Sequence, residues 1–577
     1  MKADIRDCNK RIDVVESNAN AQIIKRDMQN HVLHRRLNRG DFGVSGMPVL
    51  VNIAVAIATF HKINLSTQDV TYVCYINNHM SLPVGFKTPE DYFKETLDFL
   101  KEYSWIYQEA NTCFIKSNIL SKMPKEFRNY FQNINNHDLN QFPLVHLPLK
   151  AEPMLMEFRR RLSSLIPQEA FADPPPLEEM SHFKTENFRK MNLKKRHEIL
   201  RLAQAIHTQL QPREKEQSQQ QTAESDQEKV VLIDFGCGLG YLSEMLYKLN
   251  HNYLILGLES DPVRVEAAEK RLEAYMPGAK EAIHYRQQFI TENSKDFINE
   301  SVTELLQSNY CPRQDTLRQP TTQAIIGLHA CADLTITSMK LFLRMPQVRH
   351  LIIMPCCYHK MQMCAGTMKF HNFPLSRRLQ KVVVPDEDDD DKASDSSVIN
   401  NYSSYLNRPF LRLACQQTLK RWHKCTVEQH SRHAREMFLR AMVEALPHKE
   451  TEIVVKCKEK IDLLKENILD FNTIRHLYQL QETRDVSRRV VVDWSEEHVR
   501  EFYMLVAKYG DGEKLAEGLT CLQTAIQKLC ENLVLYDRLC FMEETAAELN
   551  LNIYVRYEKL MDEELSPRCY VLIAEKL

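Results

Sequence analysis

Residues 234–240 combine an acidic residue with glycines in a spacing that suits a ligand-binding loop. The segment is Asp-Phe-Gly-Cys-Gly-Leu-Gly, and three alternate glycines are improbable by chance in a chain with 14 glycines among 577 residues. The apolar run Val230–Phe235 precedes the three glycines and an amphipathic segment follows them, which predicts a strand, a glycine loop and a helix. Because glycine has no Cβ, a ligand can approach the backbone of such a loop closely.

The position of the third glycine and the residue that ends the next strand narrow the choice of ligand. A dinucleotide fingerprint is Gly-x-Gly-x-x-Gly, whereas Gly240 comes one residue early, and no Gly-Lys-Ser/Thr follows to make a phosphate-binding P-loop. Glu259 ends the next predicted strand, where a carboxylate can accept both hydroxyls of a ribose. The alternatives are that Glu259 caps a helix with Ser260 and Asp261, or that the glycine loop is purely structural.

The Asp-x-Gly-x-Gly-x-Gly pattern at residues 234–240 resembles motif I of class I methyltransferases. In that family the glycine loop packs against the methionine moiety and the ribose of S-adenosylmethionine. The resemblance therefore implies S-adenosylmethionine as the cofactor, and a nicotinamide-dependent oxidoreductase on a similar sheet is the competing hypothesis.

Two polar clusters follow later apolar runs, where ligands bind in open α/β sheets. One is Gly327-Leu-His-Ala-Cys-Ala-Asp-Leu334, and the other is Pro355-Cys-Cys-Tyr-His359. With the segment Lys194–Glu198, they resemble the methyltransferase-like protein 25 family, and the core is similar to tRNA 2′-O-methyltransferases of the Trm-thirteen type. The Cys/His zinc modules of those tRNA enzymes have no counterpart here, and neither does the Asn/Asp-Pro-Pro-aromatic turn typical of enzymes that methylate base amines.

The resemblance implies roles for individual side chains. His329 would face the methionine end of the cofactor, and Asp333 would hold its turn or contact the substrate. The acceptor pocket would be lined by Cys356, Cys357, Tyr358 and His359. A general base among these candidates is plausible because histidine titrates near neutrality. The predicted cofactor-binding residues are Asp234, Gly236, Cys237, Gly238, Gly240, Glu259, Ser260, His329 and Lys195.

The adjacent cysteines allow other interpretations. They are equally well explained as two buried thiols, because cysteine is often fully buried. A zinc site would draw on Cys356, Cys357, His359, Cys364 and His371, which lie within one short segment. Adjacent cysteines lack the Cys-x₂-Cys spacing of common zinc sites, so the sequence predicts no metal.

The arrangement of apolar runs predicts an α/β fold. Continuous apolar strands alternate with helices from residue 230 onward, which is typical of a parallel sheet covered on both faces. The last residues predict two strands joined by a turn around Ser566–Pro567. We therefore expect a Rossmann-like, seven-stranded class I methyltransferase sheet that ends in an antiparallel hairpin. An N-terminal helical domain and a helical insertion before the hairpin would be added to it.

Changes in composition suggest where these parts begin and end. Consecutive prolines at 174–176 mark a boundary, because they stop a helix and stiffen the chain. The predicted parts are 1–178, helical; 179–385, the methyltransferase core with a flexible loop at 211–229; 386–408, an acidic and serine-rich disordered loop; 409–548, the helical insertion and last core helix; and 549–577, the hairpin.

Bulk composition is ordinary, with 44% hydrophobic residues and a net charge of -2, so a strongly basic nucleic-acid protein is excluded. Scattered cysteines suggest reduced thiols and a cytoplasmic or nuclear location. The longest apolar run, Met47–Phe60, is too short to span a membrane and predicts a buried helix.

The acceptor is an RNA or a protein, and RNA is slightly favoured by basic clusters that could contact phosphates. These clusters are His34–Arg36, Lys194–Arg196, Arg377–Arg378 and Lys420–Lys424. The alternative is a catalytically idle methyltransferase-fold scaffold that binds protein partners through its helical regions.

Overall fold

The computed structural model describes residues 82–175, 191–211, 229–309, 322–384, 402–416, 418–457, 462–485 and 488–577. The chain divides into Met1–Asn77 and Asn78–Leu577, and every described residue belongs to the second unit. The predicted helix at 47–60, most of the loop at 211–229 and residues 386–401 of the predicted disordered loop lie outside the described residues.

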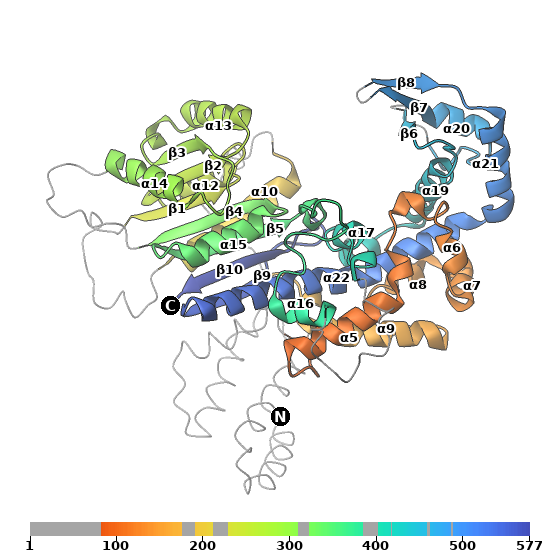
Figure 1. Ribbon diagram of the computed structural model, residues 1–577, viewed down its shortest axis with the longest axis horizontal. Helices are drawn as coiled ribbons and strands as arrows, with labels where there is room; N and C mark the ends of the chain where they lie inside the picture. The colour runs from red at the N-terminus through yellow and green to blue at the C-terminus, as the bar shows by residue number, and fades with distance from the viewer. Residues whose placement is uncertain are drawn as a thin grey trace, which may run out of the picture. The chain divides into compact units, whose positions relative to one another are not determined.

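A seven-stranded sheet carries the glycine loop, and its strand order is β3-β2-β1-β4-β5-β10-β9 (Figure 1). The strands are β1 (Val230–Phe235), β2 (Tyr253–Glu259), β3 (Ile283–Gln287), β4 (Gln323–Cys331), β5 (Val348–Cys356), β9 (Ile553–Lys559) and β10 (Tyr570–Lys576). The first five are parallel, and β10 is antiparallel to both β5 and β9. This is the predicted Rossmann-like methyltransferase sheet, including the C-terminal hairpin at its edge.

The helices cover both faces of the sheet, as right-handed crossovers require. The chain moves outward from β1 to β3, then returns to β4 on the other side of β1, so the strand order reverses between β1 and β4. One face carries α10 (Leu193–Gln209), α12 (Tyr241–Leu249) and α13 (Pro262–Tyr275), and the other carries α14 (Lys295–Asn309), α15 (Leu334–Arg344) and α22 (Gly512–Glu548). Ligands in open α/β sheets bind at such a reversal, which places β1, β2, β4 and β5 around the candidate site.

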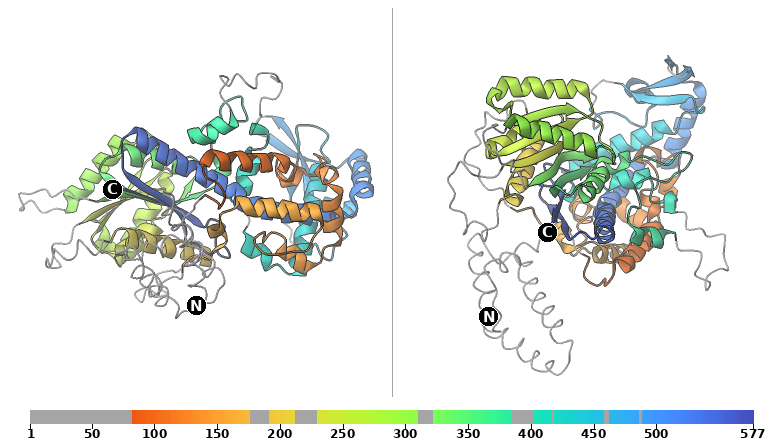
Figure 2. Two further views of the ribbon diagram at one scale, coloured as in Figure 1. Left: turned by 90° about the horizontal axis from the view of Figure 1, so that it is seen from below. Right: turned by 60° about the vertical axis from the view of Figure 1, so that its left-hand side comes forward.

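Helix α22 joins the sheet to the helical part of the protein (Figures 1 and 2). It packs on β9 and α15, and also on helices from both sides of the methyltransferase segment. Those helices are α5 (Pro89–Glu102), α6 (Ile119–Lys122), α7 (Lys125–Asn133), α9 (Pro153–Leu165), α16 (Arg377–Val383), α17 (Arg408–Leu413), α18 (Leu419–His423) and α19 (Val427–Glu444), with α8 (Asn136–Gln141) against α18. Among the described residues no helix combines the length and hydropathy needed to cross a membrane.

The insertion before the hairpin contains a small sheet that the sequence did not predict. Strands β6 (Glu452–Lys456), β7 (Tyr478–Asp485) and β8 (Arg488–Val492) are antiparallel, next to α20 (Phe471–Leu477) and α21 (Glu496–Tyr509). The expectation of a mostly helical segment missed this sheet, because β6 and β8 have only five residues each and partly exposed side chains give a weak alternating pattern.

Candidate functional site

The glycine loop lies between β1 and α12, where the strand order reverses. Gly236, Gly238 and Gly240 have φ angles of 73°, 59° and 74°, which glycine adopts without strain. A Cβ on Gly238 would meet no atom within 4 Å, so this residue faces open space. A Cβ on Gly240 would lie 2.1 Å from the Tyr285 hydroxyl, so internal packing requires that glycine. Gly238 is therefore the position at which a ligand can lie against the loop.

Glu259, at the end of β2, holds its carboxylate beside Gly238. The Gly238 N–H donates to Oε2 at 3.1 Å, and the N–H groups of Ser260 and Asp261 donate to Oε1 at 2.9 and 3.1 Å. The Ser260 hydroxyl also donates to Oε1, at 3.2 Å. Oε1 accepts three of these bonds and Oε2 only one, so a lone pair of Oε2 can still accept a hydroxyl of a ligand. Ser260 thus acts by orienting Glu259.

Asp234 and Cys237 have side chains that pack inside the protein. The Ser243 hydroxyl donates to Asp234 Oδ2 at 2.9 Å, and burial, aided by nearby Glu259, raises the pKa of Asp234 to about 7. The Cys237 Sγ lies 3.0 Å from where a Cβ on Gly257 would stand, and burial raises the pKa of this thiol. These two side chains fasten the loop to α12 and β2, and their predicted contact with a cofactor stays a prediction.

Lys195 lies on α10, beside the start of α12. Asn192 caps this helix, because its side-chain oxygen accepts the Lys195 N–H at 2.8 Å. The Lys195 Nζ lies 3.7 Å from the centre of the Tyr241 ring, directly after the glycine loop. Burial and the neighbouring Arg271 charge lower the pKa of Lys195. The cap thus positions a partly buried cation next to the loop.

His329, near the end of β4, pairs with a buried carboxylate from α10. Its Nε2 lies 3.1 Å from Glu198 Oε2, and the Ser566 hydroxyl donates to Glu198 Oε1 at 2.6 Å. Burial opposes ionisation of Glu198, but the hydrogen bonds from His329 and Ser566 outweigh it and lower its pKa. If the ionised Glu198 accepts Nε2–H, the Nδ1 of His329 is the nitrogen that can accept a proton.

Asp333 holds the segment after β5. Its Oδ2 accepts the Gln362 N–H at 2.9 Å, and its Oδ1 accepts the Asn372 side-chain amide at 2.8 Å. Of the two roles implied by the resemblance, holding the turn is the one with contacts in the structure.

Three cysteines meet at the carboxyl ends of β4 and β5. The sulfur atoms of Cys331, Cys356 and Cys357 all lie within 4.8 Å of one another, and those of Cys331 and Cys356 are 2.9 Å apart. The Arg568 guanidinium lies 3.9 Å from the Cys357 sulfur. Hydrogen bonds from the other two thiols, with the charges of Arg568 and Lys360, lower the pKa of Cys357, and the same thiol contacts raise that of Cys356.

The backbone around these side chains is strained. Five described residues other than glycine have a positive φ, and three of them, Asn118, Asn550 and His329, are of types that adopt it more readily. The other two are Ala332 and Cys357, with φ of 53° and 49°. Strain of this kind persists where surrounding contacts impose it, and it clusters at functional sites.

Tyr358 and His359 point toward the helical part. Tyr358 is 1% exposed, and its hydroxyl donates to Glu531 Oε1 at 3.4 Å. The His359 Nδ1 lies 3.4 Å from the Cys415 sulfur, and Arg408 donates to the His359 carbonyl. Burial raises the pKa of Tyr358 and lowers that of His359. Tyr358 therefore packs in the core, and its predicted place in the acceptor pocket has no support in these contacts.

The zinc ligands weighed from the sequence are not gathered at one point. Cys364 contacts His371, with 3.4 Å between Sγ and Nδ1, whereas His359 contacts Cys415. Among the described residues, the group with metal-ligand proximity is instead the three-cysteine cluster.

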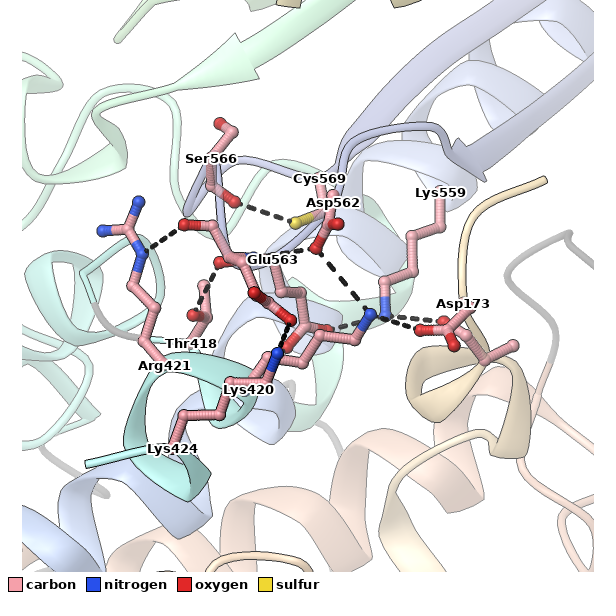
Figure 3. Close-up of polar contacts among 12 residues, drawn as sticks. Asp173, Thr418, Lys420, Arg421, Lys424, Lys559, Asp562, Glu563, Ser566 and Cys569 are labelled. Carbon is pink, nitrogen blue, oxygen red and sulfur yellow. Dashed lines mark hydrogen bonds and ion pairs between the residues drawn. The ribbon is translucent and has the colours of Figure 1, made fainter. Parts of the chain in front are cut away.

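The basic side chains at 420–424 contact carboxylates and carbonyl oxygens of the same chain (Figure 3). Lys420 pairs with Asp173 and, at 3.7 Å, with a carboxylate of the 562–565 turn between β9 and β10. Arg421 donates to two carbonyl oxygens of that turn at 3.0 Å, and Lys424 pairs with a second carboxylate there. These cations fix the turn that leads to Ser566 and Arg568.

A family model described as a methyltransferase domain matches residues 194–364. The chain contains a methyltransferase domain.

Similar solved structures include M. capricolum TrmK with S-adenosyl-homocysteine, at 15% identity and a TM-score of 0.15, covering 22% of this chain and 46% of that one. The plantazolicin methyltransferase BpumL with the same product is 9% identical with a TM-score of 0.19, covering 78% and 97%. Coclaurine N-methyltransferase with N-methylheliamine is 10% identical with a TM-score of 0.18, covering 84% and 94%. None of these superpositions bears on the acceptor.

S-adenosylmethionine is the cofactor expected of a class I methyltransferase domain, and the residues present fit it. Gly238 leaves open space beside a buried carboxylate, Glu259, that can accept ribose hydroxyls.

Three residues of the site could not be predicted from the sequence because their contacts are long-range. Glu198 and Cys331 stood within the quoted motifs without a role, and Arg568 follows the predicted turn without any motif.

Proposed function

We propose that this protein is an active S-adenosylmethionine-dependent methyltransferase, related to the methyltransferase-like protein 25 family. The observation that carries the proposal is the pairing of Gly238, after β1, with Glu259, at the end of β2, next to the point where the strand order reverses and inside a segment that matches a methyltransferase domain. A degenerate scaffold would have no need to keep a buried carboxylate aimed at an open glycine.

Each part of the loop has a separate task in this proposal. Gly238 and Glu259 hold the ribose and the adjoining chain of the cofactor, which supplies an electrophilic methyl group when bound. Asp234 and Tyr285 support the loop from behind, so the loop is preorganised rather than shaped by the ligand.

His329 is the best-placed general base for the acceptor. Glu198 fixes one ring nitrogen, and the other can take a proton from a hydroxyl or amine that attacks the methyl group. Replacing His329 with Asn should lower kcat by about 100-fold or more with little change in cofactor affinity, since general bases contribute roughly 10²–10⁴-fold. Glu198→Gln should shift the pH profile of kcat, a readout that a purely structural role would leave unchanged.

RNA remains the proposed acceptor and a protein its alternative, and the RNA proposal now depends on the resemblance. Two of the four basic clusters that favoured RNA pair with carboxylates of the same chain: Lys420 and Lys424 do so, and Arg377 and Arg378 pair with acidic residues near the end of α22. The cluster His34–Arg36 lies outside the described residues. The described cysteines are free thiols, which supports a proposed location in the cytoplasm or nucleus.

Two measurements test the proposal. Calorimetry with S-adenosylmethionine should give saturable binding, and the absence of heat at millimolar cofactor would reject it. Transfer of a labelled methyl group into extract from cells that lack the protein, separated into RNA, protein and small molecules, then identifies the acceptor. The idle scaffold predicts cofactor binding at most, with no label in any fraction. The label that is transferred when the Gly236→Arg variant replaces the wild type serves as the background.

A further inference from the structure

The three-cysteine cluster at the ends of β4 and β5 is not explained by cofactor binding. We propose that the sulfur atoms of Cys331, Cys356 and Cys357 bind one zinc ion, independently of methyl transfer. Zinc bonded to sulfur at about 2.3 Å in a tetrahedron sets its sulfur ligands about 3.8 Å apart. The three sulfurs already lie within 4.8 Å of one another, so only small side-chain shifts are needed.

The backbone supplies a second, independent argument. Successive side chains of a strand point to opposite faces, so neighbouring cysteines in regular β structure cannot share one ion. Cys357 instead has a φ of 49°, a left-handed conformation that is costly for cysteine, and its sulfur comes to the same side as that of Cys356. Ala332, directly after Cys331 at the end of β4, has a left-handed conformation as well, with a φ of 53°. A metal ion shared by the three sulfurs would explain why the backbone adopts this strained conformation.

Charge and ligand number also fit zinc. Thiolates select soft or borderline ions, and binding displaces the protons of the thiols. Three thiolates and Zn²⁺ carry one net negative charge, which the Arg568 guanidinium beside Cys357 can offset. Among the described residues no further His, Cys, Asp or Glu joins the group. The site therefore leaves one position for water or another ligand, an open position that closed structural zinc sites do not have.

A disulfide between Cys331 and Cys356 is the competing interpretation. It would use two sulfurs at a bond length near 2.05 Å and would leave Cys357, the strained residue, without a role. Common zinc sites are recognised by Cys-x₂-Cys spacing, and that criterion misses this group because one cysteine comes from β4 and two come from β5.

The test uses the full-length protein, purified with a reducing agent, incubated with Zn²⁺ and freed of excess metal. Elemental analysis should find about one zinc per chain. Substitution with Co²⁺ should give thiolate-to-cobalt charge-transfer absorption and the intense visible bands of tetrahedral coordination. Cys331→Ser and Cys357→Ser should each weaken zinc binding at least about tenfold in competition with a chelator. Cys364→Ser, outside the cluster, is the matched control and should bind like the wild type.

Several results would overturn the proposal: wild-type protein without stoichiometric metal, zinc binding unchanged in Cys331→Ser, or a Cys331–Cys356 disulfide in place of the ion. The cobalt spectrum needs only the wild type, so a variant that fails to fold does not leave the question open. Calorimetry with S-adenosylmethionine is run on the same samples. Zinc without cofactor binding would reject the proposed function alone, and cofactor binding without zinc would reject only the metal site.

Discussion

At the scale of single residues, Glu259 should control cofactor affinity. Its carboxylate is buried and held by the loop, so a ribose hydroxyl would donate to a charged acceptor, a hydrogen bond worth about 1.5–3 kcal/mol. Glu259→Gln keeps the size of the side chain and removes the charge. We expect the Kd for S-adenosylmethionine to rise by roughly 10- to 100-fold, measured by calorimetry.

The matched control for that variant is Glu266→Gln on α13. Glu266 pairs with Lys270 at the exposed surface, and such pairs contribute little to stability. It should bind the cofactor like the wild type. Equal affinities for the Glu259 and Glu266 variants would remove Glu259 from the site.

The glycines of the loop should fail in different ways when each is replaced with Ala. A methyl group on Gly240 would overlap Tyr285, a buried side chain, in addition to the strain of its positive φ. We expect Gly240→Ala to lower the free energy of unfolding by at least about 2 kcal/mol. Gly238→Ala meets open space, so it should cost only about 1 kcal/mol of backbone strain while weakening cofactor binding.

Urea denaturation and calorimetry on both variants separate these effects. Two variants with the same loss of stability and the same cofactor affinity would contradict the assignment of Gly238 to the ligand and Gly240 to packing.

The loop and Glu259 could be predicted because they are local signals, a glycine spacing and the last residue of an apolar strand. Glu198 and Cys331 could not, since their partners His329 and Cys356 are distant in sequence. Spacing along the chain carries no information about such pairs until the fold is known.

At the scale of elements, α19 and α22 are joined by a buried carboxylate. Glu517 on α22 lies 2.5 Å from His430 Nδ1 and 2.6 Å from His433 Nδ1. Burial opposes the charged form of each group, but their mutual hydrogen bonds dominate, so the pKa of His433 is raised and that of Glu517 lowered. Glu436 adds to the shift of His433.

The sign of each shift gives a pH window. A raised histidine pKa stabilises the fold below its usual value of 6.5, and this contribution is lost as the pH rises through the folded pKa. A lowered carboxyl pKa stabilises the fold above 4.5, and this contribution is lost in acid. His433→Asn should therefore lower the melting temperature most between about pH 5 and 6.5, by an amount equivalent to up to about 1 kcal/mol, and least near pH 9.

Thermal melts across this range provide the measurement, with His476→Asn as control because that side chain is exposed on α20. A melting-temperature difference that is the same at pH 6 and pH 9 would show that the His433 charge does not stabilise the contact between α19 and α22.

Elements were predictable where their pattern is strong. The sequence predicted β1 at its observed bounds and Glu259 as the last residue of β2, because buried parallel strands are continuous apolar runs. The sheet of β6 to β8 was not predicted because β6 and β8 are short and half exposed. Neither the two-residue period of a strand nor the period of a helix is clear in their sequences.

At the scale of the whole molecule, the turn between β9 and β10 ties the methyltransferase sheet to the helical part. Glu563 in this turn accepts from Lys528 of α22 and Lys559 of β9, each at 2.6 Å. Lys559 also donates to the carbonyl oxygens of Ala170 and Ala172, which follow α9. The sequence predicted separate helical and methyltransferase parts, but it could not show how they join, since Lys559 and its partners Ala170 and Ala172 are hundreds of residues apart.

This junction gives the sharpest test of stability. Lys528, Lys559 and Glu563 are 6%, 3% and 4% exposed, so removing the carboxylate charge leaves two buried lysines without their anion. Breaking a buried ion pair in this way costs about 3–5 kcal/mol. We therefore expect Glu563→Gln to lose several kcal/mol in chemical denaturation, with the helical part and the sheet unfolding together because α22 belongs to both.

Glu564→Gln, one residue later, is the matched control. Glu564 is 40% exposed and pairs with Lys424 at the surface, so its loss should cost less than about 1 kcal/mol. If Glu563→Gln were as stable as Glu564→Gln, the buried lysines would have to be neutral or solvated in the folded protein. If it unfolded in two separate transitions, the carboxylate would be holding together two parts that are each stable alone, and α22 would not be the common core that its packing indicates.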